Sequence, residues 1–288
     1  MQDFNFIKPT NLEEVSSLLI NYKDKARLIA GGTDLIIALR EERLPSNLEI
    51  IIDISHLKEL DYIREEGGYL RIGSGATHVE IAQNELIKRY APLLSQAASL
   101  IGSPQIRNRG SIAGNIVTAS PAADAVPALI VLDSRLVIRK GQEKREELLQ
   151  KVFVGPYKVN LKSDELVEEI YFKKLPQKAK SDFSKLVRRN AVDKSRVNLA
   201  VVAQQNEDKK VIDIKISAGS ITPLPQRFKE AEDLLLGEIP TANLIQKTGE
   251  KVAEEMMVKS GYRWSTEYKE PVVKSLMVRA LNRVLEVE

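Results

Sequence analysis

Residues 26–40 read ARLIAGGTDLIIALR, which predicts a strand, a glycine turn and a helix in close succession. Glycine weakens both strands and helices, so Gly31 and Gly32 indicate a point where the bare backbone itself is needed. Thr33 is the predicted N-cap of the helix, which would place unpaired N–H groups and the positive end of the helix dipole at the turn. Such a turn suits an anion such as a pyrophosphate. The alternative is a turn whose glycines only provide a positive φ.

The residues around this turn predict a small α/β unit. TNLEEVSSLLINY has apolar residues at helical spacing, with Thr10 or Asn11 as the N-cap, and LEIIIDIS is typical of a buried strand. Alternating strands and helices of this kind predict an N-terminal subdomain over residues 1–55.

Two further units follow. In residues 56–175 we expect a hairpin that turns at Gly67 and Gly68, a helical stretch broken at Pro92, a polar loop over 103–115, and strands at 134–140 and 165–175. The polar stretch KKLPQKAKSD at 173–182 is the predicted domain boundary. Residues 180–288 then form a C-terminal unit of strands and three helices, expected at 229–236, 241–260 and 270–286.

The composition limits the function. The 288 residues contain 43 Lys and Arg and 40 Asp and Glu, a net charge of +3, which argues against a protein devoted to nucleic acid. There are no cysteines and two histidines, which argues against disulfides, a thiolate nucleophile and a zinc or iron–sulfur site in this chain. No apolar run approaches the roughly 20 residues that cross a bilayer, and the N-terminus does not resemble a secretory signal. We therefore expect a cytoplasmic protein without a membrane span or a bound metal.

The stretch GSGATH at 73–78 begins like the G-x-G-x-x-G fingerprint of dinucleotide-binding Rossmann folds. His78 stands where the third glycine belongs, and no acidic residue closes a second strand about twenty residues later. We therefore predict that Gly73 and Gly75 form a turn at the end of a strand.

A second informative stretch, SIAGNIVTASPAAD, covers residues 111–124. It offers hydroxyls, an amide and a carboxylate among small residues, a set of donors and acceptors that suits phosphate oxygens and the hydroxyls of a ribose or ribityl chain. The alternative is a polar surface loop of small residues. The RNRG motif at 107–110 is expected to shape the loop or to contact a partner.

LIAGGTDL at 28–35 and SIAGNIVTASPAAD, about eighty residues apart and in this order, together resemble the FAD-binding medium subunit of the molybdenum hydroxylase family. This family includes aerobic carbon monoxide dehydrogenase, xanthine dehydrogenase and aldehyde oxidoreductases. The resemblance covers nearly the whole chain. It implies an α+β fold, with a two-subdomain FAD-binding domain of the vanillyl-alcohol-oxidase (PCMH) type followed by a small C-terminal domain of antiparallel sheet and helices.

The resemblance also implies a set of FAD-binding residues. The pyrophosphate would be held by Ala30, Gly31, Gly32, Thr33 and Asp34, with Leu28, Ile29 and Leu35 bordering the site. The other side would be lined by Ser111, Ile112, Ala113, Gly114 and Asn115, with Thr118 and Asp124 toward the ribityl chain and the flavin. Lys185 would approach the flavin edge, with Arg189 as a second candidate, Arg27 near the adenosine and Ile101 against the adenine.

Three positions depart from the family pattern. Ala113 replaces the first glycine of the commoner GGN motif, and Ile101 can flank an adenine but cannot stack on it as a ring. Lys194 stands where some relatives carry a tyrosine over the flavin. Because the chain has no cysteine, it also lacks the iron–sulfur loop that one branch inserts in this subunit.

As the resemblance implies, we expect an electron-transfer subunit with no catalytic acid, base or nucleophile of its own. Its partners would be a large subunit with the molybdenum cofactor and a small subunit with [2Fe-2S] clusters, assembled as a dimer of heterotrimers. The electron acceptor would be NAD, oxygen, a quinone or a protein, and the lack of a separable NAD motif favours an acceptor other than NAD. One alternative is a self-sufficient FAD-dependent oxidoreductase using Glu267 or Tyr268. Another is a nucleotide-binding scaffold without redox activity.

The stretch GYRWSTEYKEP at 261–271 carries Tyr262, Trp264 and Tyr268. We expect a connection between two helices that packs on its own core. The alternative is a partner surface, because tryptophan, tyrosine and arginine are enriched at interfaces.

Overall fold

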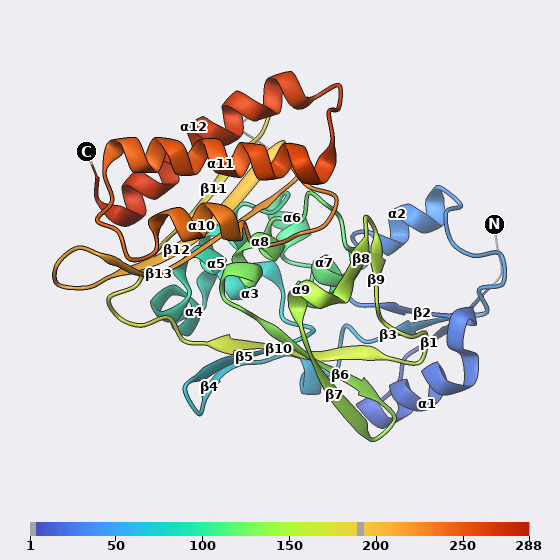
Figure 1. The fold of residues 1–288 in the computed structure, drawn as a ribbon. Helices are drawn as coiled ribbons and strands as arrows, with labels where there is room; N and C mark the ends of the chain where they lie inside the picture. The colour runs from blue at the N-terminus through green and yellow to red at the C-terminus, as the bar shows by residue number, and fades with distance from the viewer. Residues whose placement is uncertain (1–3, 189–192, 288) are drawn as a thin grey trace.

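The computed structural model describes residues 4–188 and 193–287. The first unit is a parallel sheet in the order β1-β3-β2, built from β1 (Asn5–Ile7), β2 (Ala26–Ile29) and β3 (Ile50–Asp53). Helix α1 (Leu12–Tyr22) packs against it, whereas the short helix α2 (Leu35–Arg40) stands away from the body (Figure 1).

Two capping predictions had different outcomes. Of the two candidates for α1, Asn11 is the N-cap, and its side chain accepts a hydrogen bond of 2.9 Å from the N–H of Glu14. The prediction that Thr33 caps α2 is wrong, because the N-cap is Asp34. The chain stays in a turn through Thr33, since Gly32 takes a φ of +74° and the N–H of Ala38 bonds to the carbonyl of Asp34.

The second unit contains an antiparallel sheet in the order β4-β5-β10-β6-β7. Its strands are β4 (Ile63–Glu66), β5 (Tyr69–Gly73), β6 (Arg135–Lys140), β7 (Glu143–Leu148) and β10 (Leu166–Lys173). The hairpin at Gly67 and Gly68 is confirmed, with φ of +59° and +84°. Strand β7 was not predicted from the sequence, because its residues EKREEL are almost all charged and lack the alternation that marks a strand.

Short helices cover one face of this sheet and share its apolar core (Figure 1). They are α3 (His78–Gln83), α4 (Glu85–Tyr90), α5 (Pro92–Ser99), α6 (Pro104–Arg107), α7 (Ile112–Thr118), α8 (Ala125–Val131) and α9 (Leu149–Val152), followed by the small hairpin β8 (Phe153–Gly155) and β9 (Lys158–Val159). The break at Pro92 is confirmed, and Asn84 adds a second break. The prediction of a polar loop over 103–115 is wrong. Ser103 and Ser111 cap helices α6 and α7 through their hydroxyls.

The C-terminal unit is an antiparallel sheet in the order β11-β12-β13, formed by β11 (Lys180–Leu186), β12 (Val197–Gln205) and β13 (Val211–Gly219). Helices α10 (Lys229–Leu235), α11 (Ala242–Ser260) and α12 (Thr266–Leu285) pack on it around a second core. The three predicted helices are confirmed, but the last begins at Thr266 and includes Pro271. No helix in the described part of the chain has the length and apolar character needed to cross a membrane.

Candidate functional site

The turn at Gly31 lies directly against the segment that leads into α7. A Cβ atom at Gly31 would lie 1.7 Å from the carbonyl oxygen of Arg109 and 2.9 Å from the nitrogen of Gly110. Only glycine permits this approach, so the first glycine-bearing stretch lies against the RNRG segment, which directly precedes the second stretch, 111–124. Gly31 is needed for this close contact, and Gly32 is needed for its positive φ.

The backbone of the first turn has free hydrogen-bonding capacity. No residue in the described ranges accepts a hydrogen bond from the N–H groups of Gly31, Gly32, Thr33 or Asp34. Leu28 and Ile29 lie in β2 before the turn, Ala30 follows them and Leu35 begins α2; all four are half-buried. Successive unpaired amides near a glycine are suited to an anion.

The second stretch presents a different surface. The first amides of α7 are already paired, because Ile112 donates to Ala76 at 2.9 Å and Gly114 donates to the Ser111 hydroxyl at 3.2 Å. Ser111, Ile112 and Ala113 are buried, whereas Gly114, Asn115 and Thr118 are half-buried. The Oδ1 atom of Asn115 is buried without a hydrogen-bond partner among the described residues. Helix α7 therefore presents the half-buried residues Gly114, Asn115 and Thr118, with the Oδ1 atom of Asn115 as an unsatisfied acceptor.

The RNRG segment shapes this loop. Arg107 donates from Nη1 to the carbonyls of Ile101 and Gly102 at 3.0 and 3.1 Å. Ile101 is itself 8% exposed and belongs to the core of the second unit. These bonds keep residues 101–110 compact behind the contact with Gly31.

Gly73 and Gly75 form the expected turn at the end of a strand. A Cβ atom at Gly73 would lie 2.3 Å from the Leu60 carbonyl, which accepts a hydrogen bond of 2.7 Å from the N–H of Gly75. His78 follows, 3% exposed, and its N–H donates to the carbonyl of Gly110. Burial, followed by the charge of Arg107, lowers the pKa of His78 to about 4.

Asp124 and Lys185, sixty-one positions apart, meet in a buried ion pair. Lys185 Nζ lies 2.6 Å from Asp124 Oδ2 and 2.9 Å from the carbonyl of Leu100. The other oxygen of Asp124 accepts from the Ser195 hydroxyl and, at 2.7 Å, from Asn198 Nδ2. Ser195 and Asn198 were not predicted from the sequence, because neither belongs to a motif.

The remaining candidates lie as follows. The guanidinium of Arg27 is bound to the backbone carbonyls of Asp24 and Ala26, at the opposite end of β2 from Gly31. Arg189 lies outside the described residues. Lys194 is exposed. Glu267 accepts a hydrogen bond of 2.8 Å from Tyr262, and within residues 4–188 and 193–287 it forms no hydrogen bond or ion pair with Asp124 or Lys185.

The prediction that the aromatic residues of 261–271 pack on their own core is wrong. Trp264 is 88% exposed, and Tyr262 and Tyr268 are also exposed. The chain leaves α11 at Gly261, whose φ is +65°, and this turn directs the connection outward before α12 begins.

Comparisons with known proteins identify the family of this chain. A family model described as the FAD binding domain in molybdopterin dehydrogenase matches residues 2–175, and the CO dehydrogenase flavoprotein C-terminal domain matches residues 182–284. The chain is 32% identical over 290 residues to the nicotinate dehydrogenase FAD-subunit of Eubacterium barkeri, covering 99% of this chain and 97% of that relative.

A second relative is similar in both sequence and structure. The carbon monoxide dehydrogenase medium chain of Hydrogenophaga pseudoflava is 28% identical over 279 residues, which cover 97% of this chain and 96% of the relative. A solved structure of the enzyme from that organism superimposes with a TM-score of 0.91 at 27% identity, covering 98% of this chain and 97% of the solved one. The chain belongs to the family of FAD-binding subunits of molybdenum-dependent dehydrogenases, and it is an oxidoreductase subunit.

Proposed function

We propose that this chain is the electron-transfer subunit of a heteromeric molybdenum hydroxylase and holds FAD between the turn at Gly31 and helix α7. The observation that carries the proposal is the contact of Gly31 with Arg109 and Gly110, which brings the first glycine-bearing stretch against the residues directly before the second.

The residues at this site fit the chemistry of FAD. The unpaired amides of Gly31–Asp34 can donate to pyrophosphate oxygens, and the buried, unpartnered Asn115 Oδ1 can accept from a hydroxyl. Gly114 leaves the face of α7 without a side chain, and Thr118 adds a hydroxyl near its end. When bound, FAD supplies the electron-transfer chemistry that links iron–sulfur clusters on a partner to an external acceptor.

The polar groups of Asp124 and Lys185 form the other end of the proposed site. Because they neutralise each other, the pair adds hydrogen-bonding atoms near the flavin without adding a net charge. The chain would bind and orient the cofactor, with residues 1–55 and 56–175 as the two flavin-binding subdomains and 180–288 as the C-terminal domain.

The similar relatives support a shared electron-transfer role. Their names refer to nicotinate, glyceraldehyde and carbon monoxide, although each is 28–32% identical to this chain over nearly its full length. Such different substrates indicate that the substrate pocket lies on another chain. We therefore place the molybdenum cofactor on a large partner subunit, and the [2Fe-2S] clusters on a small one. The proposed assembly is a cytoplasmic dimer of heterotrimers, and the proposed electron acceptor is not NAD.

The test is isolation of the complex from its native source through a tag on this chain. We expect two co-purifying chains, molybdenum and iron by metal analysis, and a flavin absorbance that the substrate of the complex bleaches. The chain alone should bind FAD but oxidise no substrate. Turnover of a small substrate by the chain alone would support a self-sufficient flavoenzyme, and a chain that stays colourless after incubation with FAD would overturn the proposal.

A further inference from the structure

Helix α8 is an apolar helix of the flavin-binding unit that lies on the C-terminal sheet. Its seven residues, AVPALIV, are all buried, and it packs on β12 and β13. A carboxylate stands at each end, Asp124 directly before the helix and Asp133 just after it. Both carboxylates are bound by residues of the C-terminal unit.

The first end lies in the proposed FAD site. Asp124 is 6% exposed, and a buried carboxylate is stable only when it is paired and hydrogen-bonded. Lys185 of β11 provides the charge, while Ser195 and Asn198 bind the second oxygen. Asn198 is completely buried and packs closely against Gly219. A Cβ atom at position 219 would lie only 2.3 Å from Asn198 Oδ1. The carboxylate is therefore fixed from the C-terminal side by three donors.

The turn before α8 is bound by the same unit. The carbonyl of Pro121 accepts a hydrogen bond of 2.7 Å from the N–H of Ser220, and the Ser220 hydroxyl donates to the carbonyl of Ser195. These bonds join residues 119–124 to the ends of β12 and β13.

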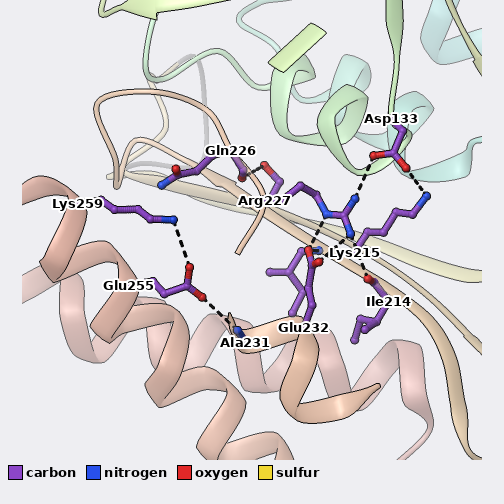
Figure 2. A network of polar contacts seen from close by, with 11 residues as sticks. Asp133, Ile214, Lys215, Gln226, Arg227, Ala231, Glu232, Glu255 and Lys259 are labelled. Carbon is purple, nitrogen blue, oxygen red and sulfur yellow. Dashed lines mark hydrogen bonds and ion pairs between the residues drawn. The ribbon is translucent and has the colours of Figure 1, made fainter. Parts of the chain in front are cut away.

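Figure 2 shows the second end, where Asp133 accepts from both Arg227 and Lys215. The Nη1 atom of Arg227 lies 3.0 Å from Asp133 Oδ1, while its other nitrogens bind Glu232 at 2.6 and 2.7 Å. Glu232 also accepts from the N–H of Ile216 in β13. Arg227 is thus held rigidly by the C-terminal unit when it binds Asp133.

We infer that the C-terminal unit positions the FAD site by holding α8 at both ends, with Ser195, Asn198 and Asp133 as positioning residues. A short, fully packed helix moves as a rigid body, so a change at Asp133 is transmitted to Asp124 at the other end. The effect on FAD rests on the proposed function. The positioning of residues 119–124 by α8 does not depend on FAD.

The first test addresses Asp124 through the hydroxyl of Ser195, which donates directly to its carboxylate. Ser195→Ala removes one hydrogen bond to a buried carboxylate, and we expect the FAD dissociation constant of the full chain to rise about tenfold. Ser195→Thr keeps the hydroxyl and should restore most of the affinity. Equal loss in both variants would show that the hydroxyl does not account for the effect and would overturn the role of Ser195.

The second test addresses the remote end. Asp133→Asn removes both ion pairs of Asp133, with Arg227 and with Lys215. Arg227 keeps its pairing with Glu232, and the Lys215 side chain is 22% exposed, so neither charge is left fully buried and unpaired. We expect FAD affinity to fall about threefold, as a partly exposed ion pair allows. The midpoint potential of the bound flavin should shift in the same direction as in Ser195→Ala, because both changes displace the same carboxylate.

The matched control is Asp164→Asn, which breaks the 2.8 Å ion pair with Lys140 in the other sheet and leaves α8 untouched. It should change neither FAD affinity nor the midpoint potential. Hydrogen exchange of residues 119–124, measured without FAD, should accelerate in Asp133→Asn and stay unchanged in Asp164→Asn.

These measurements separate the two proposals. If the wild-type chain does not bind FAD but Asp133→Asn accelerates exchange at 119–124, the proposed function fails and the positioning by α8 stands. If the wild type binds FAD while Asp133→Asn matches it in affinity, potential and exchange, the inference is overturned and the proposed function is unaffected.

Discussion

Replacement of Gly31 by alanine tests whether the close contact of the first glycine-bearing stretch with residues 109–110 builds the FAD site. The new Cβ atom would lie 1.7 Å from the Arg109 carbonyl oxygen, and Cβ contacts below 3.0 Å are essentially never observed. The turn and the 109–110 segment must therefore separate by at least 1.3 Å. The φ of Gly31 is not in the positive region, so the obstacle is space rather than backbone torsion.

The cost of such overpacking is about 1–3 kcal/mol, and if the turn moves to relieve it, FAD affinity falls about 5- to 150-fold. The assay is a titration of the purified chain with FAD, followed by flavin fluorescence, beside a thermal melt. Gly68→Ala is the control. The new Cβ atom at position 68 meets nothing within 4 Å, so no contact is disturbed and FAD affinity should stay unchanged. The φ of +84° is unfavourable for alanine, so the stability of the chain should fall. A Gly31→Ala chain that binds FAD within twofold of wild type would refute the reasoning.

Three further predictions concern stability. The pKa of His78 in the folded chain is lowered to about 4 from 6.5. As the pH falls below 6.5, the unfolded chain binds this proton before the folded chain does, so about 3 kcal/mol of stability is lost between pH 6.5 and pH 4. Urea unfolding at several pH values should show this loss in wild type and a flatter profile in His78→Asn; equal slopes would contradict it. Arg227→Met leaves the buried Glu232 carboxylate without its ion-pair partner and should cost about 3–5 kcal/mol in chemical denaturation. The double variant with Glu232→Met should recover only part of the loss, because the N–H of Ile216 then loses its acceptor. Ser111→Ala removes the N-cap of α7 and should cost about 1 kcal/mol, whereas Ser111→Thr should retain most of the stability.

Local patterns in the sequence were sufficient for the elements with a clear period or turn signal. The hairpin at Gly67 and Gly68, the three C-terminal helices and the strand-end turn at Gly73 were predicted, because apolar spacing and glycine positions act over a few residues. The charged strand β7 escaped prediction because its pairing with β6 outweighs local propensity. The start of α12 escaped prediction because proline is disfavoured inside a helix, yet α12 begins at Thr266, five residues before Pro271.

The sequence by itself determined that two glycine-bearing stretches would need bare backbone, and their order and spacing were enough to indicate the family. Only the tertiary structure decided which atoms these stretches meet: the Arg109 carbonyl for Gly31, and Lys185, Ser195 and Asn198 for Asp124. Contacts between residues sixty or more positions apart depend on how whole sheets and helices pack, so the local spacing of apolar residues cannot predict them. Trp264 shows the same limit, since the direction of a connection between two helices is set by the turn that precedes it.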